Sequence, residues 1–315
     1  GWEWEHLYSR LDDSVAAISI NVNEAVQLAR GPAGPRVVAH SDTRVRLLDL
    51  GGRELLTHSL RPGRNWGLFD LVTPSGPRML EEVGETLELL DTEGRVLRRM
   101  TGVSKMNGGI GCISADGTRL AVVWNNSFSA DAPGRRQIAV YEPSKGGDAL
   151  ARVDPMSDTW ALSLSADGTR LAAGGEDGLV RIWDGRSGTL TASCRGHESK
   201  VLSVAFRPDG RRLLTASADG SVRQWDPETG REAASPFERH TGEVMSAAYS
   251  PDGKWVASGG TDRTVRVWNA MDRREVAVLH GHTSFVRDVA FTSGGDQVVS
   301  VGAAFFKWNS ATGDG

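Results

Sequence analysis

The sequence has little of several features on which other classes of protein depend. Its 315 residues include two cysteines, too few for a disulfide framework. The 36 basic and 40 acidic residues nearly balance, whereas dedicated nucleic-acid binders carry a basic surplus. No run of 18 apolar residues is present, and the chain does not begin with a signal-peptide pattern. We therefore expect a cytoplasmic globular chain that contacts neither nucleic acid nor, through this segment, a membrane.

Sequence motifs of catalysis and metal binding are missing as well. The chain contains no GxxxxGK[ST] phosphate loop, no HExxH, no GxSxG and no kinase signature set. Cys112 and Cys194 lie in strand-like stretches without metal-ligand partners, which favours buried thiols. The pair His280 and His282 lacks a third ligand nearby. We predict no metal, no cofactor and no catalytic residue.

Glycine, in contrast, is abundant, and its 38 residues are spread along the chain, which indicates many short strands joined by turns. In the second half, segments rich in β-branched residues recur between PDG-like turns, with room for four strands each. Each of these segments closes with a tryptophan, and the closing tryptophans are 42, 43 and 40 residues apart. They are Trp183, Trp225, Trp268 and Trp308.

This period, with a GH opening, a PDG turn and a WD or WN closing, resembles the WD40 family. The pattern extends backwards, with Tyr141, Leu90 and Leu48 at the tryptophan position. The resemblance implies an all-β, seven-bladed propeller in which every blade is a four-stranded sheet. The third strand of each blade is expected to end near residues 48, 90, 141, 183, 225, 268 and 308.

The two ends of the repeat region predict how the ring closes. The last repeat stops soon after Trp308, before an outer fourth strand. Residues 14–20 align with that outer strand, and we expect them to complete the last blade, as WD40 proteins commonly do. The propeller is thus predicted to span residues 14–310, followed by a tail at 311–315.

Residues 1–13, GWEWEHLYSRLDD, precede the predicted ring. Trp4, Leu7, Tyr8 and Leu11 fall at helical spacing, which predicts a short amphipathic helix docked on the propeller edge. The WEWxxL-type stretch resembles the segment that leads into the WD40 regions of bacterial serine/threonine protein kinases. Together with the abrupt start of the chain, this resemblance suggests part of a larger signalling protein with a linked kinase domain.

In the WD40 family a His, a Ser or Thr, an Asp and a Trp often form a hydrogen-bonded tetrad within a blade. Because such sets recur here at the repeat period, we interpret them as structural rather than catalytic. The Trp183 repeat has Ala173 at the Ser/Thr position, and the last repeat has Ala304 where the Asp would fall. The two complete sets are His197, Thr215, Asp219 and Trp225, and His240, Ser258, Asp262 and Trp268.

By resemblance to peptide-binding WD40 propellers, binding is expected at the channel mouth, on the face formed by the loops between blades and between second and third strands. Counting back from the PDG-like turns gives two rings of positions there. Their aromatic residues would anchor a peptide and their charged residues would set polarity. The aromatic residues could equally plug the channel or pack between blades. The candidates are Trp66, Trp160, Phe285, Lys200, Arg287, Glu24, Asp158 and Glu243.

A second candidate site comes from the step of 51 residues between Leu90 and Tyr141. It indicates an insertion at 125–136 between the second and third strands of the third blade, carrying Phe128, Arg135 and Arg136 on the same face. A tolerated insertion without function is the alternative.

These observations favour a non-catalytic protein- or peptide-binding scaffold or sensor module. Two alternatives stay open. One is a propeller enzyme with an axial active site, which an axial metal or acid cluster would reveal. The other is a self-association module that pairs through the N-terminal helix. The identity of the partner is not encoded in any motif of the sequence.

Overall fold

The computed structural model describes the chain in stretches, and all regular elements within them are β-strands. Short runs of β-branched and apolar residues form the strands, and glycine with a positive φ, such as Gly210 at 70°, closes the tight turns between them. The described residues are 25–29, 35–40, 44–59, 66–67, 72–73, 76–77, 79–83, 86–91, 95–101, 111–126, 135–303 and 305–309.

The first three sheets are antiparallel and have four strands each. The first contains β1 (Ala25–Ala29), β2 (Arg36–His40), β3 (Arg44–Leu48) and β4 (Glu54–Ser59). The second contains β5 (Trp66–Gly67), β8 (Met79–Val83), β9 (Thr86–Leu90) and β10 (Val96–Thr101), and the small hairpin β6 (Val72–Thr73) and β7 (Gly76–Pro77) lies between β5 and β8 in sequence. The third contains β11 (Gly111–Ile113), β12 (Leu120–Asn126), β13 (Arg135–Tyr141) and β14 (Ala151–Val153).

Four more antiparallel sheets follow in the second half of the chain. The fourth contains β15 (Thr159–Leu164), β16 (Arg170–Gly175), β17 (Val180–Asp184) and β18 (Leu190–Cys194). The fifth contains β19 (Val201–Phe206), β20 (Leu213–Ser217) and β21 (Val222–Trp225). The sixth contains β22 (Val244–Tyr249), β23 (Trp255–Gly260), β24 (Val265–Asn269) and β25 (Glu275–Leu279), and the seventh contains β26 (Asp288–Phe291), β27 (Gln297–Val301) and β28 (Phe305–Asn309).

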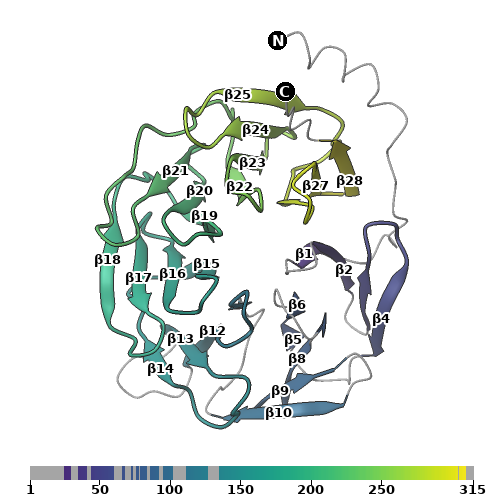
Figure 1. Ribbon diagram of the computed structural model, residues 1–315, viewed down its shortest axis with the longest axis vertical. Coiled ribbons are helices and arrows are strands. Elements are labelled where there is room, and N and C mark those ends of the chain that lie inside the picture. Colours follow the sequence, from purple (N-terminus) through teal and green to yellow (C-terminus); the bar gives the residue numbers. More distant parts are fainter. Residues whose placement is uncertain are drawn as a thin grey trace.

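The sheets follow one another around a ring, with their first strands toward the middle and β4, β10, β14, β18 and β25 on the outside (Figure 1). Buried apolar side chains fill the space between neighbouring sheets, from the second sheet onward to the seventh. The seventh sheet also packs on the first, where Val299 and Phe305 join Val37 in one cluster. For the described residues, the prediction of an all-β architecture of repeated antiparallel sheets is confirmed.

Two expectations about the ends of the ring fall outside the described residues. They are the helix at 1–13 and the outer strand at 14–20.

The fifth sheet departs from the expected four strands. Where its outer strand should lie, isolated bridges pair Val222 with Phe237 and Trp225 with Glu232. Pro236 falls between the bridged residues and has no backbone N–H to donate, so a regular ladder cannot continue through it.

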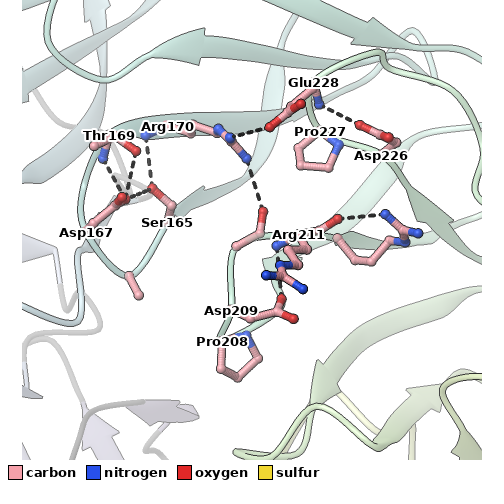
Figure 2. Close-up of a pocket in the computed structure, with 13 residues that line it drawn as sticks. Ser165, Asp167, Thr169, Arg170, Pro208, Asp209, Arg211, Asp226, Pro227 and Glu228 are labelled. Atoms are coloured by element: carbon pink, nitrogen blue, oxygen red, sulfur yellow. Dashed lines mark hydrogen bonds and ion pairs between the residues drawn. The ribbon is translucent and has the colours of Figure 1, made fainter.

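Polar side chains connect the fourth and fifth sheets at the turns that join first to second strands (Figure 2). They line a cavity of about 460 Å³. The Arg170 guanidinium lies 3.0 Å from Glu228 and donates to the carbonyl of Gly210 at 3.1 Å. Asp167 accepts from Ser165 and Thr169. The ion pair between Arg170 and Glu228, together with the bond from Arg170 to Gly210, therefore connects the two sheets at this point (Figure 2).

Candidate functional site

The predicted tetrad of the fifth sheet is a continuous chain of hydrogen bonds. His197 Nδ1 lies 2.8 Å from Asp219 Oδ2, and His197 Nε2 lies 2.7 Å from Thr215 Oγ1. Trp225 Nε1 donates to the same Thr215 hydroxyl at 2.8 Å. A neutral imidazole with its proton on Nδ1 satisfies every group, because Thr215 then donates its one hydroxyl hydrogen to Nε2.

The carboxylate at the end of this chain is saturated with donors. Asp219 accepts from the Ser221 hydroxyl and the Ser221 and Glu198 backbone N–H groups as well as from His197. Burial by itself would raise the pKa of Asp219, but the hydrogen bonds from His197 and Ser221 outweigh it and hold the pKa well below its usual range. An ionised carboxylate with all these partners orients the imidazole and serves a structural role.

The sixth sheet repeats the arrangement. His240 lies 2.8 Å from both Asp262 Oδ2 and Ser258 Oγ, and Trp268 Nε1 donates to Ser258 at 2.9 Å. Thr264 donates to Asp262 in the place that Ser221 takes in the fifth sheet. All eight predicted tetrad residues are thus brought together in two equivalent sets.

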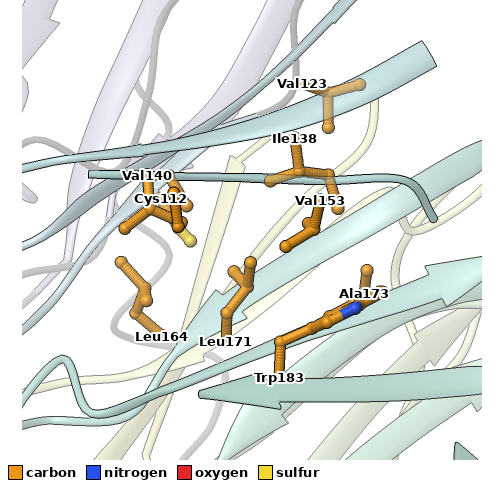
Figure 3. Close-up of a cluster of buried hydrophobic side chains, with 11 residues drawn as sticks. Cys112, Val123, Ile138, Val140, Val153, Leu164, Leu171, Ala173 and Trp183 are labelled. Atoms are coloured by element: carbon orange, nitrogen blue, oxygen red, sulfur yellow. The ribbon is translucent and has the colours of Figure 1, made fainter. Parts of the chain in front are cut away.

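The fourth and seventh sheets lack parts of the tetrad and differ in what replaces them. In the fourth sheet, Ala173 and Trp183 belong to an apolar cluster with Leu171, Ile138 and Val153 across the sheet interface (Figure 3). Its aspartate pairs with a cation instead: the two terminal guanidinium nitrogens of the buried Arg181 donate to Asp177, at 2.7 and 3.3 Å.

In the seventh sheet, His282 Nε2 and Trp308 Nε1 both reach Ser300 Oγ, at 2.7 and 2.8 Å. The buried Nδ1 of His282 has no hydrogen-bond partner among the described residues. Burial without a carboxylate lowers the pKa of His282 to about 4.

The predicted channel mouth contains an exposed aromatic side chain held by two charged ones. Trp160 is 41% exposed, and its Nε1 donates to Glu176 Oε2 at 2.6 Å. Lys200 lies 2.8 Å from the other oxygen of Glu176 and 5.0 Å above the Trp160 ring. We call these three residues, from the fourth sheet and the segment before β19, the Trp160 cluster. Cation–π contact and ion pairing fix the orientation of the indole while one side of it stays in solvent.

A recurring irregularity of the first strands brings Trp160 to this position. The register of β15 against β16 shifts between Thr159 and Ala161, so Trp160 stands outside the ladder. The same shift occurs at Leu202 in β19 and at Met245 in β22. Bulges of this kind re-aim a side chain, and here they recur at equivalent places in three consecutive sheets.

Backbone hydrogen bonds next to these positions also recur from sheet to sheet. The carbonyls of Asp158, Lys200 and Glu243 each accept from the turn between second and third strands of their sheet, at 2.8 to 2.9 Å. The side chains of Asp158, Glu243 and Arg287 are exposed, and Phe285 is 52% exposed. Six of the eight predicted channel-mouth residues are therefore placed at one end of the sheets, and the backbone of three of them is hydrogen-bonded to a neighbouring turn.

The other predicted binding residues have different outcomes. Trp66 begins β5, and its side chain, like Glu24 and Phe128, lies outside what the structure describes. Arg135 and Arg136 were expected in the inserted loop, but they open β13 and pair with Asn126 and Asn125. That expectation was wrong because part of the insertion lengthens the hairpin of β12 and β13 to seven residues per strand.

Sequence reasoning missed a cavity of about 410 Å³ at the opposite end of the first strands. Its walls come from β11, β15, β19, β22 and β26, together with Pro35. A signal for it existed, because the last residue before each PDG-like turn lines it in five successive sheets. These residues are Ile113, Leu164, Phe206, Tyr249 and Phe291.

Other kinds of site are not found in the described part of the chain. It contains no group of three or more His, Cys, Asp or Glu side chains that could hold a metal ion. Cys112 and Cys194 are buried thiols, as expected, and burial raises the pKa of Cys194 to about 12. Within the described residues, no helix has the length and apolar character needed to cross a membrane.

Comparison with known families gives matches to the second half of the chain. The family model described as WD domain, G-beta repeat, matches residues 156–184, 188–226, 232–269 and 273–304. The chain carries four WD40 repeats. They coincide with the fourth to seventh sheets, and the repeat at 188–226 joins the outer strand β18 of one sheet to the three strands of the next. WD40 repeats thus link neighbouring sheets covalently.

A curated relative is similar over a shorter stretch. Transcription initiation factor TFIID subunit 5 of Caenorhabditis elegans is 28% identical over 94 residues, which cover 28% of this chain and 14% of that protein. The similarity therefore concerns a small part of the relative. WD40 repeats generally form scaffolds for protein interaction, and this is the functional class that the four repeats indicate.

Proposed function

We propose that the chain is a seven-bladed WD40 propeller that works as a non-catalytic protein- or peptide-binding module, with its site at the Trp160 cluster. The observation that carries the proposal is the exposed indole of Trp160, which Glu176 and Lys200 already hold in place. An aromatic side chain that is ordered before binding loses little conformational entropy when a partner covers it. Tryptophan and arginine are also the residues most often found at the energetic centre of protein interfaces.

The surroundings of the cluster fit a peptide with both apolar and charged groups. Phe285 and Arg287 add a second aromatic group and a cation, and Asp158 and Glu243 add acidic groups. A rim of mixed sign matches a peptide segment better than it matches a uniformly charged phosphate backbone.

Seven blades and a closed ring are part of the proposal. It is supported by the packing of the first sheet on the seventh, where Leu28 and Val37 meet Ala290 and Val299. The backbone N–H of Leu28 also donates to Asp288 at 3.3 Å. Residues 14–20 would form the outer strand of the seventh sheet beside β28, in the position that β18 takes in the fourth sheet.

The setting of the module follows from the sequence resemblance alone. We propose that it belongs to a larger cytoplasmic signalling protein, with a bacterial serine/threonine kinase domain as the linked partner. The relative's description as a subunit of an initiation factor is consistent with a module that works through contacts with other proteins.

Selection of peptides tests the proposed site without knowledge of the natural partner. A phage-displayed peptide library is selected on the immobilised chain, and the affinities of the recovered peptides are measured by fluorescence anisotropy. Trp160→Ala and Phe285→Ala should raise Kd by about tenfold or more, since loss of an aromatic anchor costs 1 to 2 kcal/mol or more. Met271→Ala is the matched control, because Met271 is 72% exposed in the turn between β24 and β25, at the other end of the sheets. Unchanged Kd values in folded Trp160→Ala and Phe285→Ala proteins would place binding elsewhere.

A further inference from the structure

The cavity at the far end of the first strands has the dimensions and character of a small-molecule site. Its volume of about 410 Å³ falls in the range of ligand pockets, which are mostly apolar with a few placed polar groups. Three aromatic residues, Phe206, Tyr249 and Phe291, line it from three consecutive sheets, and the aliphatic residues Leu162 and Ile113 line it as well. Small side chains, among them Ala205 and Ala248, keep the space between the rings open.

Arg207 is the one charged side chain among the described residues that line the cavity. It also breaks the pattern of its own repeat. The equivalent residue in four other sheets is Ser114, Ser165, Ser250 or Thr292, and its hydroxyl donates to the aspartate of the turn that follows. In the fifth sheet the guanidinium of Arg207 takes the place of that hydroxyl. The hydrogen bonding of the turn therefore does not explain why an arginine stands at this position.

The conformation of Arg207 directs it toward the neighbouring sheet. Its Nε lies so close to the turn after β22 that a methyl group added at Gly253 would sit 2.5 Å from it. Asp209 is 3.6 Å away, a distance too long for a strong ion pair at a site that is partly exposed. Among the described residues, the terminal guanidinium nitrogens have no hydrogen-bond partner. They retain donors for an anion at the cavity mouth.

We infer that this cavity binds a small aromatic molecule carrying one acidic group, with its rings between Phe206, Tyr249 and Phe291 and its anion on Arg207. The apolar walls favour the rings, because burying them removes apolar surface from water. The guanidinium of Arg207, which has only the long contact with Asp209, favours an anion over a neutral or basic group. The site lies at the opposite end of the first strands from Trp160 and is independent of the proposed peptide site.

A pair of dyes tests both parts of the inference. The probes are 8-anilino-1-naphthalenesulfonate, which has the rings and the anion, and N-phenyl-1-naphthylamine, which has the rings alone. Each is titrated into the full chain and followed by fluorescence. Arg207→Gln removes the charge, and Ala115→Trp and Ser293→Trp fill the cavity from exposed positions that line it. Ala233→Trp is the matched control, an exposed alanine that does not line the cavity.

The wild-type chain should bind the sulfonate dye at one saturable site. Arg207→Gln should weaken the sulfonate dye about tenfold, the worth of a charge-assisted hydrogen bond, and change the neutral dye less than about twofold. At least one of the two cavity-filling variants, folded by its thermal melt, should abolish binding of both dyes, whereas Ala233→Trp and Trp160→Ala should not. The inference is overturned if neither dye saturates, if folded cavity-filling variants bind like wild type, or if Arg207→Gln weakens both dyes equally.

Discussion

The Thr215 hydroxyl supports two buried polar groups at once, and Thr215→Val tests how much the tetrad stabilises the protein. The hydroxyl lies in contact with His197 Nε2 at 2.7 Å and with Trp225 Nε1 at 2.8 Å. Thr215 is fully buried and Trp225 is 1% exposed, so water cannot replace the lost partner. Valine preserves the shape of the side chain and removes only the hydroxyl.

The expected loss follows from the two groups left without partners. An unsatisfied buried donor or acceptor costs about 1 to 3 kcal/mol, so the free energy of unfolding should fall by about 2 to 6 kcal/mol. Guanidinium-chloride denaturation followed by tryptophan fluorescence measures the change. The slope with denaturant should stay the same if the unfolding unit is unchanged.

Two further variants make this prediction specific. Thr191→Val is the matched control, since Thr191 is exposed and its hydroxyl makes a single hydrogen bond, to the carbonyl of Ile182 at 3.0 Å, so its loss should cost about 1 kcal/mol or less. Trp225→Phe removes the indole N–H, so the double variant with Thr215→Val should lose less than the sum of the two single losses. Equal and small effects of Thr215→Val and Thr191→Val would refute the view that the tetrad is a stabilising network.

Three other perturbations have defined outcomes. Because burial lowers the pKa of His282 to about 4, this histidine is protonated in the unfolded chain at a higher pH than in the folded protein. The free energy of unfolding should therefore be at its full value above about pH 6.5 and fall by about 3 kcal/mol toward pH 4. Denaturation of His282→Gln across this range should lack that decline. Asp177→Ala leaves the buried Arg181 without its carboxylate and should destabilise by about 2 to 4 kcal/mol in the same assay, an effect that Asp177→Ala/Arg181→Leu should largely reverse. Deletion of 14–20 should expose the edge of β28 and increase aggregation in light scattering, and a deletion variant that stays monomeric would argue against the proposed closure.

Most of what could be predicted about the fold and the tetrads came from the sequence repeat. Alternating apolar runs and PDG-like turns recur at short range, and they predicted an all-β chain of repeated sheets. The tetrad positions followed from the same spacing, since His197 and Thr215 reach each other through the pairing of neighbouring strands within one sheet.

What could not be predicted depends on particular backbone irregularities and on contacts between sheets. The outer strand of the fifth sheet is interrupted at Pro236, and this is seen only from how the residues around Pro236 pair. The extension of β12 and β13 placed Arg135 in a strand, because nothing in the sequence marks where an insertion stops being loop. The cavity beside Arg207 requires five first strands to converge, and no single repeat contains that information.

The most direct test of the proposed binding site is hydrogen–deuterium exchange of the chain with and without a saturating library-selected peptide. Binding at the Trp160 cluster should slow exchange in the segments before β15 and β19 and in the turn between β16 and β17, because the backbone there lies beneath Trp160, Lys200 and Glu176. The turns after β15 and β19 at the opposite end should exchange as before. The proposal would be contradicted if slower exchange were confined to the turns after β15 and β19. It would also be contradicted if the peptide were bound and exchange near Trp160, Glu176 and Lys200 did not slow.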